Sequence, residues 1–320
     1  MGIKGGIHLV KVRVPATSAN LGPGFDTLGM ALKMDNYVQI TSLQNSEKKN
    51  FTDKIITEIR VKRKDKKIEV DPGSDLILKS LEKLAQYTGE SLSNIKVTEE
   101  LVSRPAQGLG SSAAAITGTI LAANEFFQLN LSWQTLRLLA CQVEGHPDNV
   151  IAAMEGGLTV STFSSVDNFL FCEKIEPHEK FNAVIIIPEF TSNTKAQRSV
   201  VPECFDREDV IYNLSRTALL PIAFKEGRED KIGELMQDRL HQPYRCSNIP
   251  GWEEVIEAGY EAGALGIALS GAGPSIFALT KDKSRDVGKA MVDCWNKENV
   301  KAEYFVTSPD NRGSYIEEEL

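Results

Sequence analysis

Pro105-Ala106-Gln107-Gly108-Leu109-Gly110-Ser111-Ser112-Ala113-Ala114 is a turn rich in glycine and serine, and the small residues after it predict a helix from Ala113 to Ala123. Glycine lets the backbone adopt positive φ and approach an anion closely. The first N–H groups of a helix point at such an anion, and the helix dipole favours its negative charge. The stretch therefore predicts a phosphate site where a turn enters a helix.

This turn is not one of the common nucleotide motifs in its standard form. A Walker loop carries a lysine before its Ser/Thr, and no lysine precedes Ser111. A dinucleotide fingerprint has a third glycine, which serines replace here. The alternative is a plain helix N-cap, in which a serine accepts hydrogen bonds from free backbone N–H groups. The complete string is more specific than such a cap and favours nucleotide chemistry.

Composition places the chain among ordinary globular proteins. Its 320 residues allow one large or two medium domains, and 42% of them are hydrophobic and 25% charged. The net charge of -8 does not suggest a nucleic-acid partner, and no apolar run is long enough to span a bilayer. With no signal peptide and five scattered cysteines, we expect a cytoplasmic protein with reduced thiols.

Hydrophobic periodicity predicts a mixed order of strands and helices. We place a division near residue 165, which gives an N-terminal domain over 1–165 and a C-terminal domain over 166–320. The predicted helices cover 75–87, 113–123, 133–143, 149–154, 211–224, 231–237, 252–262 and 284–296. The predicted strands cover 9–14, 36–41, 55–61, 67–70, 95–97, 156–161, 169–175, 183–187, 264–269, 275–279 and 302–307.

The segment from Pro15 to Asp26 predicts a loop, because proline and glycine punctuate it. A structured turn alone would explain its shape. It does not explain the density of polar side chains directly after a strand, where α/β scaffolds place ligands. We therefore take Asn20 and Asp26 as candidates to hold a small polar substrate.

Glu144 follows a predicted helix and is the best candidate for a magnesium ligand, together with the hydroxyl of Ser112. Phosphoryl transfer needs such a carboxylate, because the metal offsets charge on the β- and γ-phosphates. The alternative for Glu144-Gly145 is a charged helix end with a glycine C-cap.

Arg198 and Arg245 are candidates to bind a carboxylate, which a planar guanidinium meets with two hydrogen bonds. The alternative is that both are surface arginines. The second glycine-rich loop, Ser270-Gly271-Ala272-Gly273-Pro274-Ser275, predicts a tight hairpin between two strands.

Four motifs in this order resemble those of the homoserine kinases, which belong to the GHMP kinase superfamily. They are Val14 to Asp26, the turn from Pro105 to Ala114 (the phosphate turn), His146-Pro147-Asp148-Asn149 and the second glycine-rich loop. The resemblance implies ATP-dependent phosphorylation of the L-homoserine hydroxyl, a step of threonine biosynthesis, with Mg²⁺. It also implies a two-domain α+β fold, with an N-terminal domain like ribosomal protein S5 domain 2 and a ferredoxin-like C-terminal domain. Homodimers are common in the family.

The resemblance also implies roles for individual residues. Asn20, Asp26, His146, Arg198, Arg245 and Gly273 would bind the substrate. Adenine would lie near residues 75–87. Asn149 stands where mevalonate kinases carry an aspartate base, and an amide cannot accept a proton. Catalysis would then rest on positioning and electrostatics.

Two other functions remain as alternatives. One is another GHMP small-molecule kinase of the mevalonate type, which the Asn20/Asp26 segment and Asn149 disfavour. The other is a non-catalytic member of the fold that binds a ligand, which Ser112 and Glu144 argue against.

Overall fold

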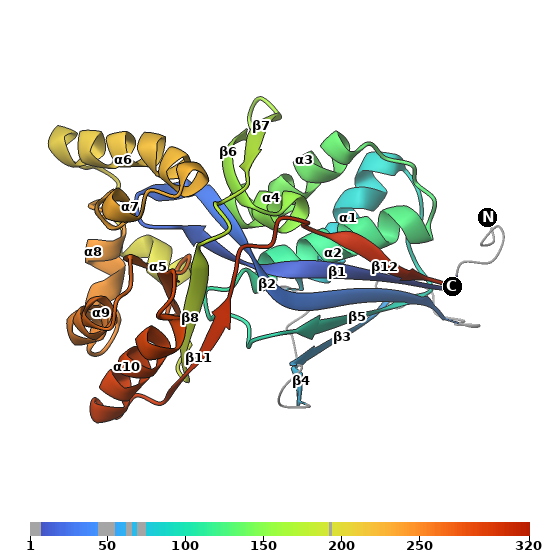
Figure 1. Ribbon diagram of the computed structural model, residues 1–320. Helices are drawn as coiled ribbons and strands as arrows, with labels where there is room; N and C mark the ends of the chain where they lie inside the picture. The colour runs from blue at the N-terminus through green and yellow to red at the C-terminus, as the bar shows by residue number, and fades with distance from the viewer. Residues whose placement is uncertain (1–7, 44–54, 62–65, 69–74, 192–193) are drawn as a thin grey trace.

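The computed structural model describes residues 8–43, 55–61, 66–68, 75–191 and 194–320, and the predicted strand 67–70 lies partly outside them. Its described strands form two sheets that lie next to each other (Figure 1). The larger has the order β12-β1-β2-β5-β3-β4, and β6 pairs with both β2 and β7. The smaller has the order β11-β8-β10-β9. This arrangement confirms the two-domain α+β fold.

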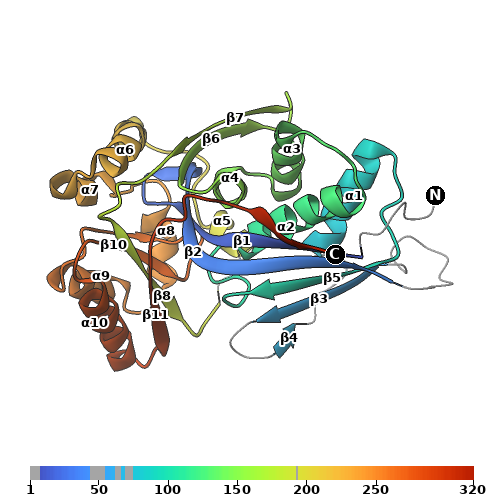
Figure 2. The same ribbon diagram turned by 45° about the vertical axis from the view of Figure 1, so that its right-hand side comes forward.

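The larger sheet carries its helices on one side (Figures 1 and 2). Helices α2 and α4 pack on the long hairpin of β1 and β2, and α1 and α3 pack beside them. The strands are β1 (Leu9–Asn20), β2 (Gly24–Ser42), β3 (Ile55–Val61), β4 (Lys66–Ile68), β5 (Ile95–Leu101), β6 (Leu158–Ser164), β7 (Phe169–Ile175) and β12 (Tyr315–Glu319). The helices are α1 (Leu76–Thr88), α2 (Ser111–Phe126), α3 (Trp133–Glu144) and α4 (Asp148–Glu155).

The smaller sheet lies between two cores. Val184 and Ile186 of β8 pack with α9 and α10, whereas Ile185 and Ile187 pack with α6, α7 and residues of β2. The core that contains Ile185 and Ile187 therefore joins the two halves of the chain. The strands are β8 (Asn182–Pro188), β9 (Gly266–Leu269), β10 (Ile276–Thr280) and β11 (Ala302–Thr307). The helices are α5 (Thr194–Ser199), α6 (Arg207–Glu226), α7 (Glu229–Leu235), α8 (Gln242–Arg245), α9 (Trp252–Glu261) and α10 (Ser284–Lys297), and a 3-10 turn covers Cys246–Asn248.

The predicted loop from Pro15 to Asp26 is wrong except for residues 21–23, which form a turn. Strand β1 continues to Asn20 and pairs with β2, with a register shift between Pro15 and Ala16. Proline is tolerated at such an irregularity because it has no N–H to donate. The polar side chains here are buried rather than solvated. The turn that remains is short, because β2 begins at Gly24.

Several elements lie outside the predicted set. The short helices α5 and α8 are new, and β12 returns from the C-terminal end of the chain to pair with β1. Strand β7 was predicted, and it pairs with β6 of the larger sheet although it lies after the predicted division near residue 165. The division near residue 165 stays a prediction. Across the described ranges, no helix combines the length and apolar character that crossing a membrane requires.

Arg13 ties the C-terminal segment to the larger sheet. Its guanidinium contacts the carboxylates of Asp35 and Asp310 and donates to the Gly313 carbonyl at 3.1 Å. Arg13 and Asp310 are each only 5% exposed. Removing one partner of a buried ion pair leaves the other charge without compensation.

We expect Arg13→Met to lower the free energy of unfolding by about 3–5 kcal/mol, because Asp310 would lose its buried partner. Urea denaturation measures this value. Lys11→Met is the matched control on the same strand, because Lys11 pairs with Glu317 at the surface and such pairs contribute below about 1 kcal/mol. Equal losses in the two variants would contradict the prediction.

Candidate active site

The phosphate turn leaves the first turn of α2 open. Gly108 and Gly110 have φ of 81° and 66°, and a Cβ on Gly110 would lie 1.9 Å from Thr17 Oγ1. Helices α1 and α3 begin with side-chain caps, Asp75 and Ser132, which accept hydrogen bonds from their first N–H groups. Helix α2 has Gly110 as its N-cap residue, and glycine has no side chain to accept such hydrogen bonds. The plain serine N-cap is therefore not what the structure has, and these N–H groups are available to an anion.

A cavity of about 290 Å³ opens at this turn. It brings together most of the predicted site residues, from both halves of the chain: Asn20, Asp26, Pro105, Ala106, Gly108, Gly110, Ser111, Ser112, Glu144, His146, Asn149, Arg198, Arg245 and Gly273. Four predicted residues of the turn do not line it. Gln107 is bonded to backbone groups behind the turn, and Leu109, Ala113 and Ala114 are buried in the core.

Ser112 and Glu144 meet in the wall of this cavity. Ser112 lies in the first turn of α2 and Glu144 is the last residue of α3, and the Ser112 Oγ donates to Glu144 Oε1 at 2.5 Å. Burial raises the pKa of the Glu144 carboxyl, and the hydrogen bond from Ser112 and the charge of His146 oppose that rise. A nearby cation would favour the ionised form. A hydroxyl and a carboxylate are oxygen donors of the kind Mg²⁺ prefers, so these residues fit the metal.

His146 is the cationic group nearest to Glu144 and Asp148. Its Nδ1 lies 2.5 Å from Asp148 Oδ1, and its Nε2 lies 3.8 Å from Glu144 Oε1. Burial lowers the pKa of His146, but the hydrogen bond and charge of Asp148, together with the charges of Glu144 and Asp26, outweigh it and raise this pKa to about 9. Asp26, His146 and Asp148 have ligand atoms within 4.8 Å of one another. A protonated imidazole is a poor metal ligand, so this group adds positive charge to the cavity.

Two arginines, Arg198 and Arg245, line the same cavity beside Asp26. Arg198 donates twice to the Asp26 carboxylate, at 2.8 and 2.9 Å. Burial raises the pKa of Asp26, but Arg198 offsets this and holds it below the ordinary value. Both guanidinium groups lie over the ring of Phe25, at 5.9 Å for Arg198 and 4.9 Å for Arg245.

Arg245 is buried without a carboxylate partner. It is 2% exposed, and it donates to the carbonyls of Gln197 and Gly271 at 3.0 and 3.3 Å. Within the described ranges no Asp or Glu forms an ion pair with it. Burial, and then the charge of Arg198, lower its pKa. An anionic ligand group beside Arg245 would therefore supply the missing negative charge.

Asn20 and Gly273 shape the wall of the cavity. The Asn20 amide donates to the Gly271 carbonyl at 3.0 Å and accepts from the Asp26 N–H at 3.1 Å. It thus connects the β1–β2 turn to the second glycine-rich loop. That loop forms the predicted hairpin, since β9 and β10 pair antiparallel on either side of it.

Thr17, Phe25 and Glu99 also belong to the site, although none was chosen from the sequence. The Thr17 hydroxyl donates to Asn149 Oδ1 at 2.7 Å. Phe25 supplies the ring under the two guanidinium groups. Glu99 lines the cavity from β5. Thr17 and Phe25 lie in the segment from Pro15 to Asp26, whose polar composition is a signal in the sequence. The signal for Glu99 is weaker, because it only interrupts the apolar alternation of β5.

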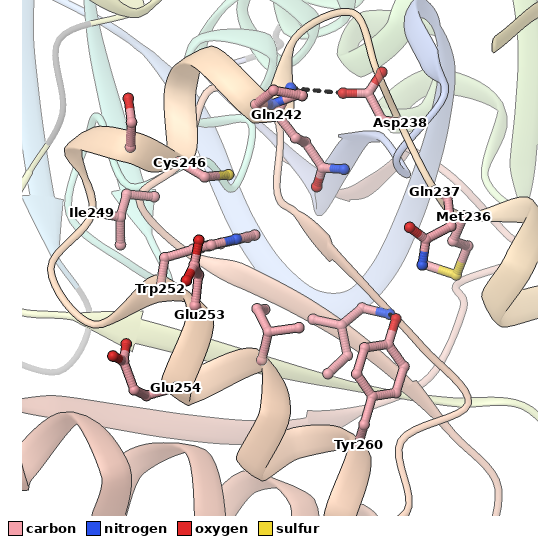
Figure 3. A pocket seen from close by; sticks show the side chains of 14 residues that line it. Met236, Gln237, Asp238, Gln242, Cys246, Ile249, Trp252, Glu253, Glu254 and Tyr260 are labelled. Carbon is pink, nitrogen blue, oxygen red and sulfur yellow. Dashed lines mark hydrogen bonds between the residues drawn. The ribbon is translucent and has the colours of Figure 1, made fainter. Parts of the chain in front are cut away.

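A second cavity, of about 510 Å³, lies beside the short helix that carries Arg245 (Figure 3). Asp238 in its wall accepts hydrogen bonds from the N–H groups of Leu240, His241 and Gln242 and so anchors the start of α8. The Gln242 side chain accepts from the Leu269 N–H at the end of β9. This wall thus fixes α8 against the strand that leads into the second glycine-rich loop.

Family models match both halves of the chain. The description "GHMP kinases N terminal domain" matches residues 75–157, and "GHMP kinases C terminal" matches residues 222–300. The first match contains the phosphate turn and Glu144. Enzymes of this superfamily use ATP.

Relatives that match over nearly the full length identify the family within this superfamily. A homoserine kinase of Halothermothrix orenii is 38% identical over 310 residues, 94% of each chain. One of Desulfitobacterium hafniense is 38% identical over 96% of this chain and 100% of its own. The crystal structure of homoserine kinase from Cytophaga hutchinsonii matches with a TM-score of 0.84 and 26% identity, over 99% of both chains. The chain therefore belongs to the homoserine kinase family of the GHMP kinases.

Proposed function

We propose that this chain transfers the γ-phosphoryl group of ATP to the hydroxyl of L-homoserine, giving ADP and O-phospho-L-homoserine. The observation that carries the proposal is the placement of Arg245. This buried cation, which has no carboxylate partner in the described part of the chain, lines the same cavity as the open first turn of α2. One cavity thus offers a site for a carboxylate and a site for phosphates.

The amino acid is recognised by charges of both signs. Arg245 and Arg198 would hold its carboxylate, and Asp26, whose lowered pKa keeps it ionised, would hold its ammonium group. A zwitterionic amino acid suits this site, because the Asp26–Arg198 ion pair lies beside the further cation Arg245. Mevalonate lacks the ammonium group, and galactose lacks both charges.

The phosphates of the nucleotide would lie at the first turn of α2, where N–H groups and the helix dipole favour them. Ser112 and Glu144 would hold Mg²⁺, which when bound neutralises charge on the β- and γ-phosphates. His146, whose Nε2 lies 3.8 Å from Glu144 Oε1, adds a second positive charge beside this pair. The transferring phosphoryl group is thus surrounded by donors and cations before the acceptor arrives.

Asn149 cannot act as a general base for the acceptor hydroxyl, because an amide does not accept a proton. Its Oδ1 accepts from Thr17, which leaves its amide N–H groups to donate into the cavity. The substrate oxygen attacks phosphorus, the bond from phosphorus to the β-phosphate oxygen breaks, and the hydroxyl proton leaves to a phosphate oxygen or water. Positioning and electrostatics carry this step, as a loose transition state allows.

The proposal predicts ADP release that depends on L-homoserine and a product with a phosphate ester signal in phosphorus NMR. Two analogues test the recognition of each charge: 4-hydroxybutanoate lacks the ammonium group, and 3-aminopropan-1-ol lacks the carboxylate. We expect each to lower kcat/KM by roughly 10–150-fold, the equivalent of one lost charge-assisted hydrogen bond. No turnover with homoserine, or faster turnover with mevalonate or galactose, would overturn the proposal.

Thr17 and Asn149 are predicted to act as a unit. Thr17→Val removes the hydrogen bond that fixes the Asn149 amide, and we expect kcat to fall about ten-fold with little change in KM for ATP. Asn149→Ala should lower kcat at least as much, and the double variant should be no slower than Asn149→Ala. Thr17→Ser keeps the hydroxyl and serves as the control. Additive losses in the double variant would show that the two residues act separately.

The charge of His146 is predicted to depend on Asp148. His146 is cationic below its pKa, which is raised to about 9. In Asp148→Asn that pKa should fall by about 1–2 units, because the carboxylate that stabilises the cation is gone. NMR titration of the imidazole in the metal-free protein measures the shift. The variant should then lose more of its rate at pH 8 than at pH 6, and an unchanged pKa would refute the assignment.

A further inference from the structure

The part of the cavity beyond the phosphate turn is apolar. Ile59, Leu76, Leu101 and Ala115 line it, and it is continuous with the turn in one cavity. A nucleotide whose phosphates lie at the first turn of α2 would place its base against such a surface. This step rests on the proposed function, since it takes the donor to be a nucleotide.

Glu99 and Asp75 are the two acidic residues in this otherwise apolar wall, and Glu99 is the one on β5. It occupies an inward position of β5 between the buried residues Val97 and Leu101, and it is 1% exposed. In register it lies beside Val38 of β2 and Ile59 of β3, which are both apolar. Its Oε1 has no hydrogen-bond partner within the described part of the chain. Because a buried polar atom without a partner is costly, this atom points to a ligand that completes it.

The charged group that faces Glu99 is Asp75, at the start of α1. Its Oδ1 is occupied by the N–H groups of Ile77 and Leu78, and its Oδ2 accepts from Thr57 at 2.8 Å. Asp75 therefore repels a charge on Glu99 and offers it no hydrogen. Burial, and then this repulsion, raise the pKa of Glu99 to about 8. The raised pKa favours the carboxylic acid at neutral pH, and this form has one donor and one acceptor side by side.

We propose that the Glu99 carboxyl group reads the base of the bound nucleotide and makes Glu99 a specificity-determining residue. Its O–H donates to a ring nitrogen, and its C=O accepts from an adjacent exocyclic amino group. A 6-aminopurine presents this pair of atoms on one edge. A base without the amino group leaves the carbonyl unpaired in an apolar pocket, which penalises its binding.

The test measures nucleotide binding by calorimetry with Mg²⁺ and no acceptor. The ligands are ADP and the diphosphate of purine riboside, which lacks the amino group. Glu99→Leu removes donor and acceptor, and Glu99→Gln keeps both but does not ionise. Glu100→Gln is the matched control, because Glu100 is the next residue of β5 and faces the other side of the sheet.

At pH 7.5 we expect the wild type, Glu99→Gln and Glu100→Gln to favour ADP over the analogue about ten-fold, the equivalent of one hydrogen bond. Glu99→Leu should bind ADP at least ten-fold more weakly and show no preference. Above pH 8 the wild type and Glu100→Gln should lose affinity relative to Glu99→Gln by about ten-fold per pH unit, because the ionised carboxyl cannot donate. Titration of His146 is common to all four proteins and cancels in this comparison.

An unchanged affinity and preference in Glu99→Leu would overturn the inference, as would the wild-type pH dependence in Glu99→Gln. Circular dichroism confirms that each variant is folded, and an apolar side chain suits this apolar wall. If the wild type binds ADP as described but does not phosphorylate homoserine, only the proposed function fails. If it binds no nucleotide, both fail.

Discussion

The close approach of the phosphate turn to the β1–β2 hairpin is the constraint on which the site depends. Thr17 donates its N–H to the Leu109 carbonyl at 3.2 Å, and its hydroxyl occupies the space that a Cβ on Gly110 would need. On the other side, a Cβ on Gly108 would lie 2.3 Å from the Ser270 carbonyl. The turn is therefore held between the hairpin and the second glycine-rich loop, which come from different halves of the chain. Glycine at both positions is what allows the start of α2 to lie at the junction.

This junction explains how the charges of the site are arranged. The carboxylates of Asp26 and Asp148 are each paired with a cation, Arg198 and His146. The charges of Glu144 and Arg245 are less fully compensated. Glu144 accepts a hydrogen bond from a neutral hydroxyl, and Arg245 donates to backbone carbonyls. These two groups are the ones that a cation and an anion from solution would complete. The sites proposed for metal and for substrate carboxylate thus follow from the buried charges that the fold leaves unbalanced.

Sequence patterns predicted the features of this chain that have local causes. Strand β3 and helices α1 and α3 were predicted close to their observed bounds, because alternation and helical periodicity depend on neighbouring residues. The extension of β1 to Asn20 was missed because Thr17 and Ser18 are polar. Thr17 contacts Leu109 and Asn149, and Ser18 contacts Ser270, so their burial results from tertiary contacts that local sequence does not encode. Strand β12 was missed for a similar reason, since its run of glutamates pairs with a strand about 300 residues away.

The same distinction separates the residues that motifs reveal from those that require the fold. Ser112, Glu144 and Asn149 belong to recognisable strings, whereas Glu99 occupies a position where the strand pattern calls for an apolar side chain. The hydroxyls of Thr117 and Thr119 are also buried without a partner among the described residues, but they are neutral and do not line the cavity. Glu99 differs because it can ionise and because it borders the cavity where a base would lie. A polar residue that violates its local pattern is best explained by a ligand when both conditions hold.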